Sequence, residues 1–183
     1  MADYKLILDR CAKGDAKSQR LLYDLLKGKV MGICYRYGGS TEVAADIFQD
    51  TMVKVFRNIR EAQNVDSLIA WVTRITVNTA IDYTRRKKPQ LFAEVEDLSE
   101  VDITDQEASI IEQMQAHELL ELLRELPLAQ MHVFNLYMIE GFSHREIAIK
   151  IGVAESSSRV LLSRAKGRLI ELLSKIKLHE KAS

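Results

Sequence analysis

The stretch from residue 126 to residue 168 carries the signals of short helices and a tight turn. Ser143 followed by Glu146 fits a capping box, in which each side chain satisfies a backbone N–H at the helix start. Gly152 can adopt the left-handed turn that ends a helix, and a second helix follows from about Glu155. Apolar residues recur at helical spacing between the two signals: Ile147, Ala148 and Ile151. The pattern predicts a helix-turn-helix, whose second helix lies in the major groove of DNA.

The composition favours an all-α fold. The 183 residues include only two prolines and eight glycines, and 47% of them are apolar, enough for one or two buried cores. No stretch approaches the ~20 apolar residues that cross a bilayer, so we expect no membrane insertion. The first residues lack the apolar core and cleavage site of a signal peptide, which predicts a cytoplasmic protein.

The sequence contains no pattern that indicates catalysis, a cofactor or a metal. Its two cysteines, Cys11 and Cys34, lack metal-ligand spacing and are expected to be reduced and packed rather than a redox-sensing pair. The four histidines are scattered through the chain. No phosphate-binding glycine-rich loop or nucleophile–base pair appears. We therefore expect neither an enzyme nor a metalloprotein.

The net charge of zero hides a strong segregation of charge. Residues 54–88 carry eight basic and three acidic side chains, and residues 141–183 carry nine and four. Residues 89–112 hold eight acidic side chains and no basic one. Each block alone is compatible with an ordinary solvated face. Together they suggest two modules that face nucleic acid, joined by a flexible acidic linker.

Helical periodicity predicts four helices in the N-terminal module, at residues 4–11, 16–37, 41–59 and 68–86. The expected core positions of the second are Leu22, Leu25, Leu26, Met31, Ile33 and Cys34. The third has an apolar stripe of Ala44, Ile47, Phe48, Thr51, Met52, Val55, Phe56 and Ile59. The expected inner face of the fourth is Leu68, Trp71, Val72, Ile75 and Thr79.

The periodicity weakens over residues 90–108 and returns near residue 110. Pro127 then starts a helix that should run through Met138. The expected architecture is two small helical domains, an N-terminal bundle at residues 1–89 and a C-terminal helix-turn-helix domain at residues 113–183. The acidic linker occupies residues 90–112.

Both modules resemble one family, the bacterial RNA polymerase sigma factors of the extracytoplasmic-function (ECF) group. Their second domain is similar to the segments AADIFQDTMVKVFRNI and SLIAWVTRITVNTAIDYTRRKK. Their fourth domain is similar to LPLAQMHVFNLYMIEGFSHREIAIKIGVAESSSRVLLSRAKGRL. These factors carry only those two domains and a linker, so the resemblance covers nearly the whole chain in the correct order.

The resemblance implies that the polar face of the third helix binds core RNA polymerase. The residues on that face are Asp46, Gln49, Asp50, Val53 and Arg57. Val53 is an unusual residue for a merely solvated surface and suits a partner contact. The alternative is an ordinary solvent-exposed helix face that binds no partner.

The resemblance also implies that the N-terminal module binds and opens the −10 promoter element. Strand opening without ATP requires a pocket for an extruded base and cations for the DNA backbone. The candidate residues are Asn64, Asp66, Ser67, Arg74, Asn78, Arg85, Arg86 and Lys87. Asn78 can both donate to and accept from a base edge. Trp71 is a possible stacking platform, but its spacing favours the core.

The helix-turn-helix would then read the −35 element. Its candidate DNA-binding residues are Ser156, Ser157, Ser158, Arg159, Ser163, Arg164 and Lys166. Arg159 is the best candidate for a base contact. The chain departs from the family pattern at Ala154, where a capping Ser or Thr is common, and at Val160 and Leu161, where a polar or basic residue would add a contact. The −35 contact set is therefore open.

The sequence thus predicts a sigma factor with core RNA polymerase and promoter DNA as partners and an anti-sigma protein as a further one. The acidic linker would lie in a basic polymerase channel. One alternative is a stand-alone helix-turn-helix regulator, which leaves the third and fourth helices unexplained. Another is a protein that sequesters a partner and does not bind DNA.

Overall fold

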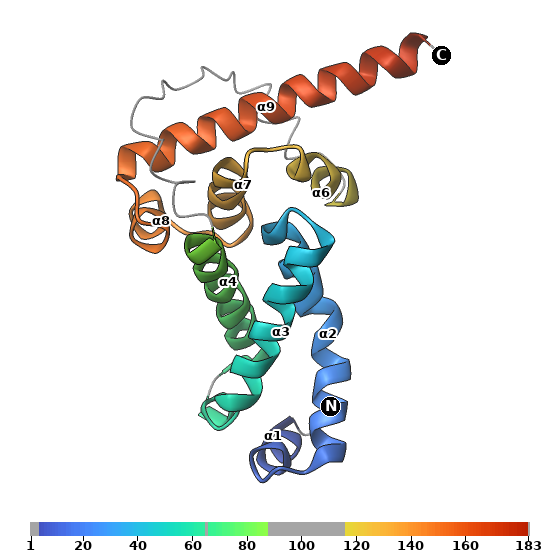
Figure 1. The fold of residues 1–183 in the computed structure, drawn as a ribbon, viewed down its shortest axis with the longest axis vertical. Coiled ribbons are helices and arrows are strands. Elements are labelled where there is room, and N and C mark those ends of the chain that lie inside the picture. The colour runs from blue at the N-terminus through green and yellow to red at the C-terminus, as the bar shows by residue number, and fades with distance from the viewer. Residues whose placement is uncertain (1–3, 65, 88–115, 183) are drawn as a thin grey trace. The chain divides into compact units, whose positions relative to one another are not determined.

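The computed structural model describes residues 4–64, 66–87 and 116–182, and these contain helices and no strand (Figure 1). Two compact units divide the chain at Tyr83 and Thr84. The all-α prediction is confirmed. The predicted linker at 90–112 lies outside the described residues, and the boundaries at 89 and 113 stay predictions.

The helices of the first unit are α1 (Tyr4–Ala12), α2 (Ala16–Gly38), α3 (Thr41–Arg57), the 3-10 helix η1 (Glu61–Asn64) and α4 (Leu68–Lys87), which continues past the division.

The helices of the second unit are α6 (Ala116–Arg124), α7 (Leu128–Phe134), the π-helix η3 (Asn135–Ile139), α8 (His144–Ile151) and α9 (Glu155–Ala182). Both α7 and α8 pack on α9 (Figure 1). Their shared core contains Val133, Phe134, Leu136, Ile147, Ile151, Leu161, Ala165 and Leu169, all buried. None of the described helices combines the length and the apolar content needed to span a bilayer.

A break at Gly14 and Asp15 separates α1 from α2. Gly14 has a φ of 84°, which a glycine adopts without strain. The Asp15 carboxylate caps α2 by accepting a hydrogen bond of 2.8 Å from the Ser18 backbone N–H. Hydrogen bonds from Ser18, through its side chain and its backbone, lower the pKa of Asp15 below its usual value. The predicted break is therefore confirmed.

The pair α2 and α3 forms the centre of the first unit, and the two helices lie side by side (Figure 1). At their junction, a Cβ on Gly38 would lie 2.9 Å from the Ala44 backbone nitrogen, so only glycine allows the observed approach. Gly39 follows in the left-handed region at φ 72°, and Ser40 caps α3 through a 3.3 Å bond from the Val43 N–H.

The predicted stripe of α3 is confirmed as buried except for Phe56, which is half-exposed. The prediction for α2 was wrong in part. Leu25 is 49% exposed and Met31 is half-exposed, whereas the buried set also includes Val30 and Tyr37. Four of the six predicted core residues, Leu22, Leu26, Ile33 and Cys34, are buried as expected.

The inner face of α4 also differs from the prediction. Leu68, Trp71 and Ile75 are half-exposed, whereas Val72 and Thr79 are buried as predicted. The other buried residues of α4 are Thr76, Val77, Ala80, Ile81 and Thr84. Thr76 and Thr79 can turn inward because their hydroxyls donate to backbone carbonyls one turn earlier, at 2.8 Å each. A hydroxyl satisfied within its own helix costs little to bury, so Thr76 can lie inside together with Thr79, which we expected on the inner face.

The helix predicted from Pro127 to Met138 changes type on the way. It is α-helical to Phe134 and then forms the π-helix η3, in which the Glu140 N–H donates to the Asn135 carbonyl at 3.0 Å. A π-turn holds one residue more than an α-turn, so the side chains that follow are rotated around the axis. The periodicity of the apolar residues did not predict this change.

Candidate functional site

The face of α3 predicted to bind polymerase is exposed along its whole length. Asp46, Gln49, Asp50 and Arg57 all lie at the surface, and Val53 is 66% exposed. These five residues, which we call the docking face, lie opposite the buried stripe of α3. The face thus combines carboxylates and an amide with one exposed apolar side chain, a combination suited to a protein partner.

Two polar links join α3 to α4. The Tyr83 hydroxyl donates to the Asp46 carboxylate at 2.7 Å. The Lys54 ammonium donates to the Thr79 hydroxyl at 3.1 Å and lies 3.9 Å from the Asp82 carboxylate. Asp46 belongs to the docking face, and Tyr83 lies within one turn of the basic end of α4. The links therefore join the helix that carries the docking face to the helix that carries most of the candidate −10 residues.

The loop before α4 is only partly described. Asp66 and Ser67 are exposed, the backbone of Asn64 ends η1, and the Asn64 side chain lies outside the described part of the chain. Ser67 caps α4, because its hydroxyl accepts a 3.2 Å bond from the Ala70 N–H. Ser67 thus has a structural role in addition to any contact with DNA.

The predicted DNA-facing residues of α4 are accessible to different degrees. Arg74 is exposed and Asn78 is half-buried. Arg85, Arg86 and Lys87 are exposed and form the last turn of the helix. Basic side chains in a last turn interact favourably with the helix dipole, and their exposure also leaves them open to phosphates.

The helix-turn-helix forms as predicted. Ser143 and Glu146 make both bonds of the capping box: the Ser143 N–H donates to the Glu146 carboxylate at 2.9 Å, and the Glu146 N–H donates to the Ser143 hydroxyl at 3.3 Å. Bonds from the Ser143 backbone and side chain lower the pKa of Glu146. Gly152 ends α8 at φ 78° and ψ 41°. Ala154 directly precedes α9, and its carbonyl accepts the Ser158 N–H at 3.1 Å.

A histidine joins the two helices of this motif. One ring nitrogen of His144, Nδ1, lies 3.0 Å from the Ser158 hydroxyl, and its ring stacks on Tyr137 with 4.5 Å between centroids. Ser158 is fully buried and Ser157 is 8% exposed. The hydroxyl of Ser158 is thus enclosed and bonded inside the motif, which does not favour the DNA contact that we predicted for this residue. Ser157 is likewise turned toward the interior.

Among the predicted DNA-binding residues of α9, Ser156 and Arg159 are exposed, and Ser163, Arg164 and Lys166 are half-exposed. The Arg159 guanidinium is paired with the Glu155 carboxylate at 2.5 Å, and this pair is open to solvent. Leu161 is 2% exposed and belongs to the core. From the sequence we expected position 161 to face DNA, with Leu161 in place of a polar or basic residue. The structure instead places Leu161 in the core of the motif.

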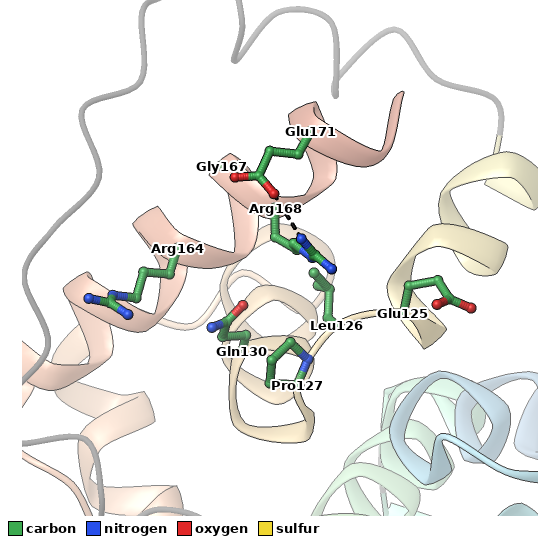
Figure 2. A pocket seen from close by; sticks show the side chains of 8 residues that line it. All are labelled: Glu125, Leu126, Pro127, Gln130, Arg164, Gly167, Arg168 and Glu171. Carbon is green, nitrogen blue, oxygen red and sulfur yellow. Dashed lines mark hydrogen bonds and ion pairs between the residues drawn. The ribbon is translucent and has the colours of Figure 1, made fainter. Parts of the chain in front are cut away.

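A pocket of about 580 Å³ lies between the α6–α7 corner and the middle of α9 (Figure 2). Figure 2 shows Arg168 turned toward Glu171, to which it is bonded at 2.8 Å. The pocket is lined by Glu125, Leu126, Pro127, Gln130, Arg164, Gly167, Arg168 and Glu171. The lining contains two basic and two acidic side chains, so its net charge is zero and does not favour an anionic or a cationic ligand. No group of three potential metal ligands occurs among the described residues.

Comparison with known proteins identifies the family. The model of Sigma-70 region 2 matches residues 22–90, and the model of Sigma-70 region 4 matches residues 116–169. The ECF RNA polymerase sigma factor SigW of Bacillus subtilis is 32% identical over 84 residues, 46% of this chain and 45% of its own. The chain belongs to the ECF sigma factors.

Two longer matches support this assignment. SigM of Mycobacterium tuberculosis is 31% identical over 135 residues, which cover 73% of this sigma factor and 66% of SigM. SigE of Mycolicibacterium smegmatis is 29% identical over 150 residues, 80% of this chain and 58% of its own. The chain thus spans about half to two thirds of the length of these relatives.

Sequence reasoning missed three residues that organise the sigma factor's surfaces. Tyr83 and Lys54 link the docking face to α4, and His144 joins the helices of the helix-turn-helix. Tyr83 and Asp46 are 37 residues apart, and no periodicity relates them. His144 directly follows a capping serine, a position that shows where the helix begins but not which residue the ring contacts.

Proposed function

We propose that this sigma factor binds core RNA polymerase and directs it to promoters, with its N-terminal unit on the −10 element and its C-terminal unit on the −35 element. The observation that carries the proposal is the order of the two matches, region 2 at residues 22–90 and region 4 at residues 116–169, on two helical units. The exposed docking face and the exposed outer side of α9 support it. The chain would act without catalytic chemistry of its own, in the cytoplasm.

The proposed DNA contacts follow from exposure. For the −35 element they are Ser156, Arg159, Ser163, Arg164 and Lys166, with Ser157 and Ser158 left out because they are buried. For the −10 element they are Asp66, Ser67, Arg74, Asn78, Arg85, Arg86 and Lys87, and Asn64 stays a prediction. An anti-sigma partner and the seating of the acidic linker in a polymerase channel also stay predictions from the family resemblance.

The test mixes the purified chain with bacterial core RNA polymerase and a randomised promoter library and sequences the run-off transcripts. We expect transcripts that share two upstream elements at a fixed spacing, because two units bound to one polymerase read DNA at a fixed separation. DNA binding without polymerase binding would instead identify a stand-alone regulator. The variant Asp50→Asn separates the two, because a regulator would be indifferent to it.

A further inference from the structure

We propose that Tyr83 is a positioning residue for polymerase docking, and that its hydroxyl holds the Asp46 carboxylate in the orientation that the polymerase binds. The inference rests on the proposed function and adds to it a residue outside the docking face. Tyr83 is on α4, whereas the docking face is on α3. A helix assigned to DNA therefore also shapes the surface assigned to the polymerase.

The geometry is that of a well-formed hydrogen bond to a charged group. The Tyr83 hydroxyl and the Asp46 Oδ2 are 2.7 Å apart, a usual distance for a hydroxyl that donates to a carboxylate. Asp46 is exposed, and Tyr83 is half-exposed. The bond therefore lies at the surface and not in the core, where it would serve only to satisfy a buried group.

A second hydrogen bond joins α3 to α4 near the C-terminal end of α3. Lys54, two turns beyond Asp46, donates to the Thr79 hydroxyl at 3.1 Å. That hydroxyl donates in turn to the Ile75 carbonyl at 2.8 Å, so both its donor and its acceptor functions are used. The docking face is thus tied to α4 near both of its ends, which limits rotation of α3 about its axis.

The bond at Asp46 leaves acceptor capacity for a partner. A carboxylate has two oxygens with about four acceptor sites, and Tyr83 uses one site on Oδ2. A cation of the polymerase can still bind at Oδ1. Tyr83 already holds the Asp46 side chain in one orientation in the free protein. Binding therefore loses less conformational entropy at Asp46 than it would with a freely rotating side chain.

The experiment is a double-mutant cycle on the affinity of the full chain for bacterial core RNA polymerase, measured by fluorescence titration. The variants are Tyr83→Phe, Asp46→Ala and the double variant. We expect Tyr83→Phe to weaken binding about three- to tenfold, which is the net contribution of one ordinary hydrogen bond. In the Asp46→Ala background the same change should alter affinity less than about twofold.

Two controls separate positioning from general damage. Tyr4→Phe removes a hydroxyl from a half-exposed ring on α1 and should leave affinity unchanged. Thermal unfolding followed by circular dichroism reports stability, since Tyr83→Phe keeps the ring. A purely structural role for Tyr83 would weaken binding by the same factor in both backgrounds and lower the unfolding midpoint in parallel.

Each outcome is decisive. Unchanged affinity in Tyr83→Phe, or an equal loss in the Asp46→Ala background, overturns the inference while the wild-type chain still binds polymerase. A wild-type chain that does not bind core polymerase overturns the proposed function itself. A loss confined to the background with Asp46 intact supports the inference.

Discussion

At the scale of single residues, burial determines which side chains can react or bind. Both cysteines are free and buried, and burial raises the pKa of Cys11 and that of Cys34, the latter to about 12. A thiol with so high a pKa forms almost no thiolate at neutral pH, and the thiolate is the reactive species. The thiols should therefore be inert while the chain is folded.

The expected result with Ellman's reagent at pH 8 is negligible labelling of the native chain and two equivalents in guanidinium chloride. Labelling should follow global unfolding, so a destabilised variant should react faster in proportion to its unfolded fraction. Rapid native labelling of Cys34 would contradict the burial described for α2 and favour the redox-sensing alternative.

Ser158 and Arg159 are neighbours with opposite expected roles. Ser158→Ala removes the hydroxyl bonded to His144 inside the motif and should lower the free energy of unfolding by about 1–3 kcal/mol. Arg159→Ala removes an exposed side chain whose ion pair with Glu155 contributes at most about 0.5 kcal/mol. It should leave stability nearly unchanged and weaken −35 binding by about 1–3 kcal/mol. Chemical denaturation and promoter-binding titrations measure the two effects, and a reversed assignment would contradict the geometry of α9.

At the scale of the helix, Gly38 and Gly32 form a matched pair on α2. A Cβ at Gly38 would meet the Ala44 backbone, so Gly38→Ala should force α2 and α3 apart and cost about 1–3 kcal/mol. A Cβ at Gly32 meets nothing within 4 Å, so Gly32→Ala should stabilise the chain by up to about 1 kcal/mol. Urea denaturation of both variants gives the comparison. Equal effects would show that helix propensity, and not the close approach, determines the choice of glycine.

The capping box of α8 predicts a pH dependence. The pKa of Glu146 is lower in the folded chain than the unfolded value of about 4.3, because Ser143 donates to the carboxylate. The stabilisation is therefore complete above that unfolded value and is lost as the pH falls through the folded pKa. Glu146→Gln should be less stable than the wild type at pH 7 and should show a flatter loss of stability between about pH 5 and 2. Circular dichroism along a pH series, with urea midpoints, checks this.

The elements show what the sequence could and could not predict. The α3 stripe, the capping box and Gly152 were predictable, because each depends on residues within one or two turns of each other. The π-helix, the inward Thr76 of α4 and the enclosed Ser158 were not. The burial of Ser158 depends on its contact with His144 in another helix, and the burial of Thr76 depends on a hydrogen bond to its own helix. Polarity alone would place both side chains at the surface. The candidate site followed the same rule: the exposure of the polar face of α3 was predictable, and its link to Tyr83 was not.

At the scale of the whole molecule, substitutions in the two units should reduce transcription in different patterns. Val53→Asp alters a side chain that is 66% exposed, so the fold should be kept while the docking face is damaged. Transcription should then fall on every promoter, because recruitment of polymerase precedes recognition. Arg159→Ala should impair only promoters that depend on the −35 element. In vitro transcription on templates with intact and scrambled −35 elements distinguishes the patterns, and promoter-selective loss in Val53→Asp would contradict the division of labour.

The division of α9 into an enclosed side and an open side bears on how such a protein changes over generations. Ser158, Leu161 and Ala165 are held in the interior, and substitutions there put folding at risk. Ser156 and Arg159 face outward and are free of that constraint. Under the proposed −35 role of α9, new target sequences can be acquired by exchanging a few outward residues while the scaffold is retained. The same property makes this helix a practical starting point for building factors that drive chosen genes without interfering with one another.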